Sequence, residues 1–194
     1  MINQNNNKII LSSQSPRRQM LIKELGLDFE VVLKNIEEVY DSKMNSFDVP
    51  EYLAGLKIEP FIKEKCKDVV ITSDTVVILE DKILGKPKTK DDAVAMLQSL
   101  SGKTHHVVSG VCILKDGIKS SFSTITKVTF DSLLNTEIEG YINTFNPFDK
   151  AGAYGIQEWI GYAKISSITG CYYNVMGIPL RDLYKKLLEL EIIN

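Results

Sequence analysis

The sequence contains few of the residue types that most often carry metal or nucleophilic chemistry. Its 194 residues include only two histidines and three cysteines. Cys66, Cys112 and Cys171 are odd in number and widely spaced, which suits neither a disulfide framework nor a zinc site. His105 and His106 are adjacent in a stretch that alternates like a strand, so one is expected to face inward and the other outward. We therefore expect three reduced, packed thiols and little basis for histidine-based catalysis.

The signatures of the commonest hydrolases and nucleotide-binding folds are also missing. There is no G-x-S-x-G, no P-loop and no G-x-G-x-x-G. No apolar run approaches a membrane span, and the first residues, MINQNNNK, lack the apolar core of a signal peptide, so we expect a cytoplasmic protein. The net charge of −2 argues against nucleic-acid binding through a broad basic surface, although a local cationic pocket remains compatible with it.

The remaining composition is that of an ordinary globular protein, with 44% hydrophobic and 25% charged residues. Residues 1–7 are rich in Asn and Gln, and we expect a disordered leader there. Residues 8–194 contain no repeat, linker or boundary, which favours a single domain. Strand-like and helix-like segments are mixed along this domain, so the predicted class is α/β (α+β) around an extended, mostly antiparallel or mixed sheet.

Hydrophobic periodicity and turn residues place the expected elements. The strands are expected over residues 8–11, 29–32, 69–79, 83–87, 107–114, 121–130 and 163–168. The helices are expected to begin at Pro16, at the opening residues 48–50, at Lys90, after a cap at Asn135, and at Pro179. Pro60 should kink or end the second of these helices, because proline removes a backbone donor.

One acidic residue interrupts the apolar, β-branched stretch VVITSDTVVILEDKILGKP, residues 69–87. An ionised Asp74 there costs on the order of several kcal/mol unless it is paired or bound to a metal. The polar residues 80–82 can turn the chain. If that turn has two or three residues, Asp74 and Lys86 become neighbours across a hairpin. A structural ion pair and a functional pair are both compatible with this pattern.

The segment Ser15-Pro16-Arg17-Arg18 is a candidate anion site. Ser15 suits the N-cap of a helix, and Pro16 suits its first position. Arginines in the first turn oppose the helix dipole, but together with free backbone N–H groups they suit a phosphate. The alternative is that both arginines are solvated or pair with distant carboxylates.

A second candidate region is the glycine-rich stretch 146–157. Its small residues allow a ligand to approach the backbone closely. It places Asp149, Lys150 and Gln157 on irregular backbone, where binding sites often lie. A plain glycine-rich turn is the alternative interpretation.

Cations and carboxylates in one cleft would fit a polyphosphate with a divalent metal. The carboxylates would hold Mg²⁺ or Mn²⁺, and the cations would neutralise the phosphates. The residues concerned are Arg17, Arg18, Lys57, Lys86, Glu38 and Asp74.

Six segments together closely resemble the Maf family of nucleoside triphosphate pyrophosphatases. They are LSSQSPRRQMLIKELGLDFEVV, the pair Glu37-Glu38, SDTVVILEDKILGKP, MLQSLSGKTHHVVSGV, FDKAGAYGIQ and CYYNVMGIPLRDLYKKL. The resemblance covers nearly the whole chain after residue 7. It implies hydrolysis of a nucleoside triphosphate to the monophosphate and pyrophosphate with a divalent metal. It also implies a two-lobed Maf/ITPase-like fold with a long twisted sheet and a cleft between the lobes, commonly dimeric.

Carried over residue by residue, the resemblance makes Asp74 the general base that activates water. It places Ser13, Arg17, Arg18, Glu38, Lys57 and Lys86 in the phosphate and metal pocket, with Glu38 and Asp74 on the metal. The family's usual A-R-E-K-A reads Ala54-Gly55-Leu56-Lys57-Ile58 here. Lys57 fits by its distance from Asp74, and Lys65 is the alternative.

Three positions carry the substrate prediction. Relatives acting on dTTP and UTP match Arg17, Thr75 and Gln157, whereas a sister group acting on 7-methyl-GTP has Trp, Gln and Glu there. The resemblance therefore favours dTTP and UTP, with Asp149 and Lys150 beside Gln157 at the substrate. The alternatives are 7-methyl-GTP or a modified pyrimidine triphosphate as substrate, and a nucleotide-binding regulator that does not hydrolyse.

Overall fold

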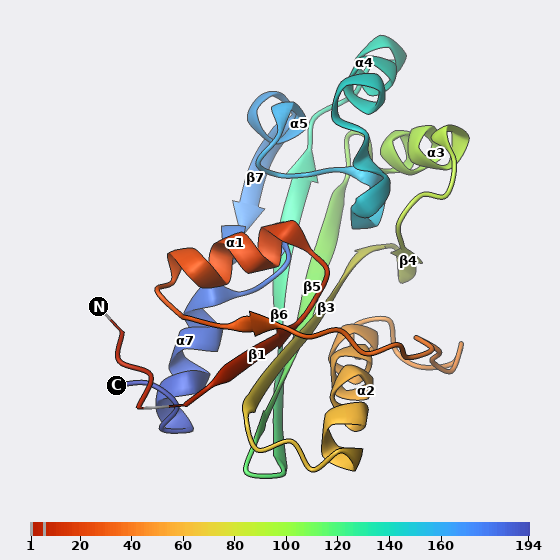
Figure 1. Ribbon diagram of the computed structural model, residues 1–194. Helices are drawn as coiled ribbons and strands as arrows, with labels where there is room; N and C mark the ends of the chain where they lie inside the picture. Colours follow the sequence, from red (N-terminus) through yellow and green to blue (C-terminus); the bar gives the residue numbers. More distant parts are fainter. Residues whose placement is uncertain (1, 6) are drawn as a thin grey trace. The chain divides into compact units, whose positions relative to one another are not determined.

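The computed structural model describes residues 2–5 and 7–194 (Figure 1). Seven strands form one sheet with the order β2-β1-β3-β5-β6-β7, and β4 pairs with β3 off this path. The strands are β1 (Ile9–Ser12), β2 (Glu30–Val31), β3 (Val69–Leu79), β4 (Lys82–Leu84), β5 (Thr104–Lys115), β6 (Ile118–Phe130) and β7 (Ile165–Thr169). The helices are α1 (Pro16–Glu24), α2 (Val49–Lys63), α3 (Lys90–Leu100), α4 (Asn135–Phe145), α5 (Trp159–Ala163), α6 (Tyr172–Met176) and α7 (Leu180–Glu189), with 3₁₀ turns η1 (Pro147–Asp149) and η2 (Ala151–Ala153).

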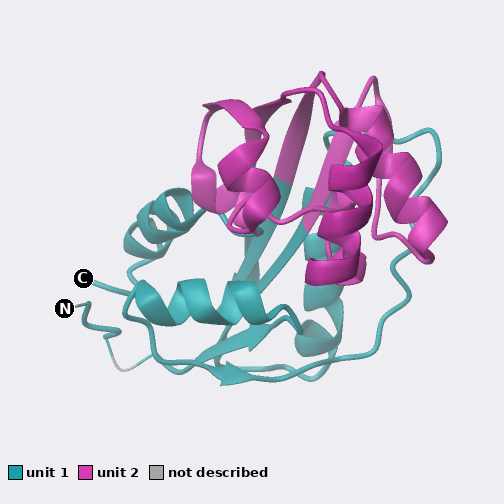
Figure 2. Ribbon diagram, turned by 90° about the horizontal axis from the view of Figure 1, so that it is seen from above, with its two compact units in different colours: residues 1–74, 109–124, 177–194 teal, residues 75–108, 125–176 magenta. Residues whose placement is uncertain are grey.

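The sheet contains both kinds of strand pairing. β1 is parallel to β2 and to β3, whereas β3 with β4 and β6 with β7 are antiparallel. The predicted mixed sheet and α/β class are therefore confirmed. The chain divides into two compact units, drawn in teal and magenta in Figure 2, and strands β3, β5 and β6 contribute residues to both.

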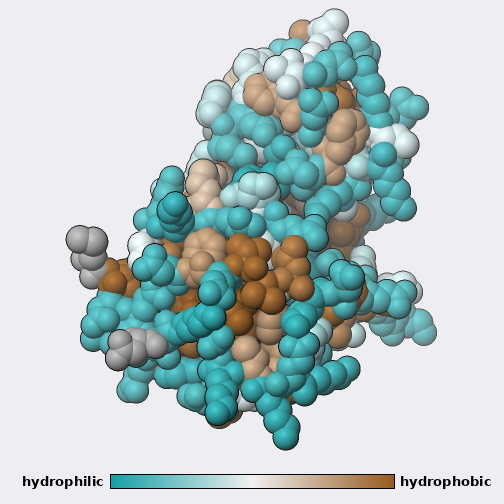
Figure 3. All heavy atoms as spheres, in the orientation of Figure 1, coloured by the Kyte–Doolittle hydropathy of each residue, from teal (hydrophilic) through white to brown (hydrophobic). Residues whose placement is uncertain are grey.

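The first unit comprises Met1–Asp74, Ser109–Thr124 and Gly177–Asn194. Its core lies between α2 and the sheet, where Ile58 and Phe61 of α2 pack with Val70 of β3 and Leu114 of β5. Burying these side chains, at about 1.5–3 kcal/mol each, holds the helix on the sheet. On the face in Figure 3, hydrophilic side chains cover most of the surface and apolar residues show between them.

Helix α1 begins and ends as its sequence predicts. Pro16 is its first residue, and the Ser15 side chain accepts a hydrogen bond from the Arg18 N–H. Gly26 follows the helix with a φ of +90°, a conformation that glycine adopts without strain.

Helix α2 does not end at Pro60 but continues to Lys63. The proline removes one helical hydrogen bond, to the Leu56 carbonyl. The helix persists past it because Ile58 and Phe61, on either side, are almost fully buried. The alternative that Pro60 ends the helix is therefore wrong, since tertiary packing outweighs one lost bond here.

The second unit comprises Thr75–Val108 and Ile125–Met176. The predicted hairpin is confirmed: Glu80 and Asp81 have φ of +49° and +65°, as a two-residue turn with a right-handed strand twist requires. The residue pair of the hairpin that lies farthest from the turn is Val77 with Leu84. The ladder therefore stops before Lys86, and a pairing of Lys86 with Asp74 stays a prediction.

Four further expectations concern the cysteines, the histidines, the first residues and membrane spans. The cysteines are free thiols, as expected. His105 is fully buried and its neighbour His106 is partly exposed, as the alternation predicts. Residues 1 and 6 of the predicted leader lie outside the described residues, while Asn3 exchanges two backbone hydrogen bonds with Asn194. Among the helices of the described chain, none has the length and apolar character needed to cross a bilayer.

Candidate active site

Three side chains predicted for the site meet in the first unit. Lys57 projects from α2, Asp74 from β3, and Glu38 from the segment between β2 and α2. The Lys57 Nζ lies 2.6 Å from Asp74 Oδ1 and 3.2 Å from Glu38 Oε1. The side chains of Lys57 and Asp74 are each 15% exposed and that of Glu38 is 51% exposed. One ammonium thus serves two carboxylates, and it supplies the partner that an acid in this strand requires.

Thr72 fixes the elements that carry this cluster. Its side chain is fully buried, and its Oγ1 donates to the Ala54 carbonyl of α2 at 2.7 Å. Ala54 is nearly one helical turn before Lys57, and Thr72 is two residues before Asp74 on the same strand. The bond therefore ties α2 to β3 beside the ion pair. Sequence reasoning missed Thr72, because no local pattern shows which carbonyl a strand threonine will reach.

Arg18 lies at the start of α1 with its guanidinium held by oxygen atoms. Its Nη1 donates to the Ser73 carbonyl at 2.9 Å and to Ser13 Oγ at 3.4 Å, and its Nε donates to the Gly177 carbonyl at 2.8 Å. The structure thus brings Ser13 and Arg18 together next to the strand residue that precedes Asp74. Ser73 is buried, and its Oγ has no hydrogen-bond partner within residues 2–5 and 7–194.

Charges around Arg18 link it to the ion-pair cluster. Burial lowers the pKa of the Arg18 guanidinium from its ordinary value, and the positive charge of Arg17 acts in the same direction. The negative charges of Asp74 and Glu38 oppose this shift. Since a guanidinium stays protonated in proteins, α1 brings a fixed positive charge close to both carboxylates.

The alternative lysine lies elsewhere. Lys65 is exposed and follows α2 in left-handed backbone, with a φ of +54°. Of the two lysines considered for the phosphate site, only Lys57 contacts Asp74 among the described residues. Lys57 and Asp74 are 17 positions apart in the sequence, and the packing of α2 on the sheet brings them together.

Two of the predicted substrate residues of the second unit, Asp149 and Lys150, belong to an ion-pair network. The Lys150 Nζ lies 2.8 Å from Asp149 Oδ1 and 3.1 Å from Glu158 Oε1, and the Lys150 side chain is only 9% exposed. The Tyr141 hydroxyl donates to Glu158 Oε2 and accepts from the Gly155 N–H at 2.9 Å. Lys150 therefore holds the loop together, and direct contact with substrate stays a prediction.

Tyr141 and Glu158 are residues that sequence reasoning missed. Burial, followed by the hydrogen bond to Glu158, raises the pKa of Tyr141, so its hydroxyl stays protonated and can donate. A Cβ at Gly155 would lie 2.8 Å from the Glu158 carboxyl carbon. Glycine is therefore the residue that leaves room for this carboxylate. The carboxylate occupies the space that a Cβ would fill.

Gln157 is held in this loop with one polar atom available. Its backbone carbonyl accepts from the Tyr162 hydroxyl. Its side-chain Oε1 is buried without a hydrogen-bond partner in the described chain. Leaving a buried amide oxygen of this kind unpaired costs about 1–3 kcal/mol. Of the other predicted residues in this unit, Thr75 is partly exposed and Lys86 is exposed.

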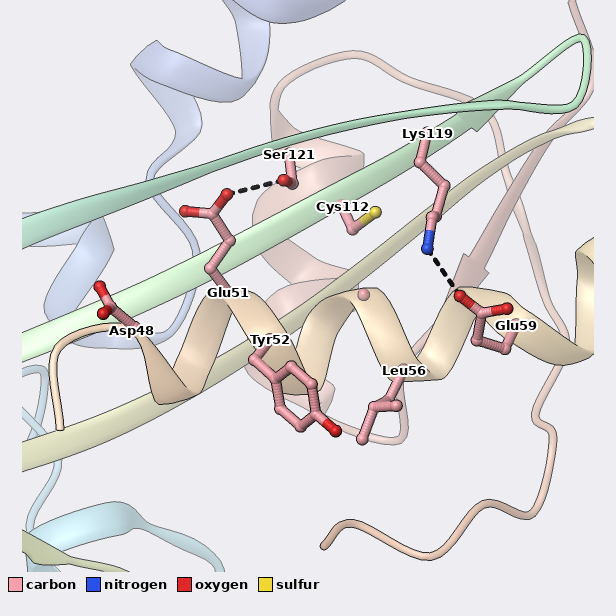
Figure 4. Close-up of a pocket in the computed structure, with 9 residues that line it drawn as sticks. Asp48, Glu51, Tyr52, Leu56, Glu59, Cys112, Lys119 and Ser121 are labelled. Atoms are coloured by element: carbon pink, nitrogen blue, oxygen red, sulfur yellow. Dashed lines mark hydrogen bonds and ion pairs between the residues drawn. The ribbon is translucent and has the colours of Figure 1, made fainter. Parts of the chain in front are cut away.

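A cavity of about 460 Å³ lies on another side of α2 (Figure 4). Two of its carboxylates are paired within it: Glu51 accepts from Ser121 Oγ, and Glu59 accepts from Lys119 Nζ, each at 2.6 Å. Glu59 is two positions from Lys57, which is about 160° around a helix. The cavity is therefore separate from the ion-pair cluster, and its residues are not those predicted for the site. It is lined by Asp48, Glu51, Tyr52, Gly55, Leu56, Glu59, Cys112, Lys119 and Ser121.

Sequence comparisons with known proteins identify one family. The family model for Maf-like protein matches residues 8–190. A dTTP/UTP pyrophosphatase of Phocaeicola vulgatus is 46% identical over 94% of this chain and 96% of its own, and one of Flavobacterium psychrophilum is 48% identical over 95% of each. The Ham1 protein of Staphylococcus aureus is a similar solved structure, with a TM-score of 0.48 and 16% identity over 63% of this chain and 71% of that one. On the family model and these near-complete matches, the chain belongs to the family of Maf-like proteins.

Proposed function

We propose that this chain hydrolyses dTTP and UTP to the nucleoside monophosphate and pyrophosphate. The observation that carries the proposal is identity of 42–48% over 93% or more of the chain with proteins curated as dTTP/UTP pyrophosphatases. The pairing of Asp74 with Lys57 supports it, because a carboxylate and cations are both needed for attack on a polyphosphate.

In the proposed reaction, a water oxygen attacks the α-phosphorus. The bond from the α-phosphorus to the bridging oxygen breaks, and pyrophosphate leaves with that bonding electron pair. The Asp74 carboxylate takes the proton of the water. Arg17, Arg18 and Lys57 neutralise charge on the phosphates, and Ser13 contributes a hydroxyl. Lys86 is proposed to contribute a further positive charge to the phosphates.

Glu38 and Asp74 are proposed to hold Mg²⁺ or Mn²⁺. The described residues contain no cluster of three or more His, Cys, Asp and Glu side chains of the kind that holds a metal by protein alone. Mg²⁺ is usually bound through one or two carboxylates, with substrate phosphates and water completing its shell. Two carboxylates that converge on one ammonium fit that requirement. Once bound, the metal would offset negative charge on the phosphates.

Selectivity for the base is proposed to depend on Arg17, Thr75 and Gln157. The Gln157 amide oxygen is buried and can accept a hydrogen bond, and uracil and thymine each offer one ring N–H donor. Asp149 and Lys150 are proposed to support this loop at the substrate.

A panel of triphosphates tests the proposal. The purified protein, with Mg²⁺ or Mn²⁺, is incubated with dTTP, UTP, dCTP, dATP, dGTP and 7-methyl-GTP, and nucleotide products are separated by chromatography. Phosphate is measured with and without added inorganic pyrophosphatase. We expect turnover of dTTP and UTP, the monophosphate as product, and phosphate only after pyrophosphatase is added. Preference for 7-methyl-GTP, direct release of phosphate, or binding without turnover would each contradict the proposal.

We further propose that residues 8–194 act as one catalytic domain, that the protein works as a homodimer, and that it is located in the cytoplasm. These proposals follow from the resemblance and from the composition. Size-exclusion chromatography with light scattering tests the dimer, and fractionation of the source cells tests the location.

A further inference from the structure

The Lys57 ammonium contacts both of the carboxylates that are proposed to bind a metal. Its nitrogen lies 2.6 Å from Asp74 and 3.2 Å from Glu38. An ammonium has three donors and a single positive charge, so one group can satisfy two carboxylates at once. In this structure the protein itself supplies one positive charge against the two negative charges of the pair.

A divalent cation that binds Glu38 and Asp74 must compete with that ammonium. Lys57 and Asp74 are largely buried, so the repulsion between the ammonium and an added cation is weakly screened. A free metal ion therefore meets carboxylates that already share an ammonium, which offsets part of their negative charge. The ammonium would have to leave before the metal could use both of them.

Lys57 differs from Arg18 in how easily its charge can move. Arg18 also acts electrostatically on Asp74 and Glu38, but it is fixed by the carbonyls of Ser73 and Gly177. Within residues 2–5 and 7–194, the ion pairs and hydrogen bonds of the Lys57 ammonium are to these two carboxylates. A lysine head group is a compact charge on a flexible stem, and phosphate oxygens are a strong alternative partner for it.

We propose that Lys57 makes metal binding at Glu38 and Asp74 conditional on the triphosphate. Without nucleotide, the ammonium occupies both carboxylates and keeps metal affinity low. When the triphosphate binds, its oxygens draw the ammonium away, and the carboxylates become available to the metal that accompanies the substrate. This inference rests on the proposed function for the identity of the site. Because binding couplings are reciprocal, metal should also strengthen nucleotide binding.

The test measures binding of Mn²⁺ alone to the nucleotide-free protein, with free Mn²⁺ quantified by electron paramagnetic resonance. Lys57→Met removes the competing charge while keeping the stem, and we expect its Kd for Mn²⁺ to fall by about tenfold or more. Lys57→Arg keeps a positive charge and should bind Mn²⁺ as weakly as the native protein. Lys57→Gln is a second neutral variant in case Lys57→Met does not fold.

Two further variants identify the site that changes. Adding Asp74→Asn to Lys57→Met should abolish the gain in affinity, because one of the two carboxylates is lost. Lys119→Met is the matched control, since Lys119 also pairs with a carboxylate of α2, Glu59 at 2.6 Å, but outside the cluster. It should leave Mn²⁺ binding unchanged.

The outcome can be separated from that of the proposed function. If folded Lys57→Met and Lys57→Gln bind Mn²⁺ no more tightly than the native protein, the inference is overturned even when dTTP and UTP are hydrolysed. A gain that survives Asp74→Asn would also overturn it, because the metal would then lie elsewhere. If the gain appears as expected but no triphosphate is hydrolysed, the proposed function fails and the competition at these carboxylates stands.

Discussion

The Lys57 ammonium lies 2.6 Å from Oδ1 of Asp74, and both side chains are largely buried. This contact accounts for an acid in a strand whose remaining residues are almost all buried. A buried carboxylate with a nearby ammonium avoids most of the desolvation cost that it would carry alone. It also places a potential proton acceptor next to a cation that can bind phosphate.

Replacing Asp74 with asparagine separates binding from chemistry. The Asp74→Asn substitution keeps the size and shape of the side chain but removes the carboxylate that would accept the proton of water. We expect turnover of dTTP to fall by about 10²–10⁴-fold, the usual contribution of a general base, while the affinity for dTMP without metal stays within a few-fold. Initial rates and calorimetric binding of dTMP measure the two effects.

The control for this prediction is Asp116→Asn in the turn between β5 and β6. Asp116 is exposed, and its left-handed backbone suits asparagine equally well. Both rate and affinity should be unchanged. A folded Asp74→Asn protein that retains more than about a tenth of the native rate would be incompatible with the general-base role.

A glycine in β5 is required by the close approach of α2. A Cβ at Gly110 would lie 2.2 Å from the backbone nitrogen of Glu51 and 2.3 Å from the Pro50 carbonyl carbon. These are main-chain atoms at the start of a helix, so they cannot move away from the added Cβ by a change of rotamer. We expect Gly110→Ala to lower the free energy of unfolding by at least about 3 kcal/mol, the upper range of overpacking effects. Urea denaturation measures the change.

The same helix offers the matched comparison. A Cβ at Gly55 would meet no atom within 4 Å. Because glycine inside a helix costs about 0.5–1 kcal/mol relative to alanine, Gly55→Ala should stabilise the protein by that amount. If both substitutions have small effects, α2 does not lie as close to β5 as the structure places it.

Local chemistry predicted those parts of the fold that depend on neighbouring residues. Ser15 and Pro16 are typical of a helix start, and the hydrogen bond from the Arg18 N–H to Ser15 confirms it. Glu80 and Asp81 were recognisable as a turn because apolar residues flank them on both sides. In each case the stabilising group lies within three residues, so the sequence pattern contains the whole interaction.

Interactions between distant segments were predictable only in part. Asp74 in an apolar strand indicated that some cation must be near, but the sequence did not show that Lys57 would also contact Glu38. No pattern marked Thr72 as the tie between β3 and α2. The continuation of α2 beyond Pro60 depends on burial of Phe61, which is a property of the packed core.

The loop that carries Gln157 should depend on the Tyr141 hydroxyl. Tyr141 is 2% exposed, and its hydroxyl serves both the Glu158 carboxylate and the Gly155 N–H. Tyr141→Phe leaves both groups without that partner, so we expect a loss of about 1–3 kcal/mol in the free energy of unfolding. Tyr173→Phe, at an exposed tyrosine of the same unit, should change stability by less than about 0.5 kcal/mol. Equal, small effects of the two substitutions on the free energy of unfolding would mean that the Tyr141 hydrogen bonds do not stabilise the loop.

His105 should make the protein less stable in mild acid. Its ring is fully buried, its Nε2 lies 2.7 Å from the Tyr154 hydroxyl, and it packs edge-on against Phe130. Burial, with a smaller effect from the charge of His106, lowers the pKa of His105 from 6.5 to about 4. The unfolded chain therefore takes up a proton below pH 6.5, whereas the folded protein does so only near pH 4. Stability is unaffected by this group above pH 6.5 and falls between those values, by about 3 kcal/mol in total.

Urea denaturation of the native protein and of His105→Gln at pH 7, 5.5 and 4.5 measures this effect. Glutamine can keep a hydrogen bond to Tyr154 but has no proton to gain, so the difference in stability between the two proteins isolates the histidine. We expect His105→Gln to be the less stable protein at pH 7, because it fills the site less well. The gap should narrow steadily as the pH falls, because only the native protein loses the contribution of an uncharged buried imidazole. A gap that stays constant from pH 7 to 4.5 would mean that His105 takes up its proton equally in the folded and unfolded chains, which its burial between Phe130 and Tyr154 argues against.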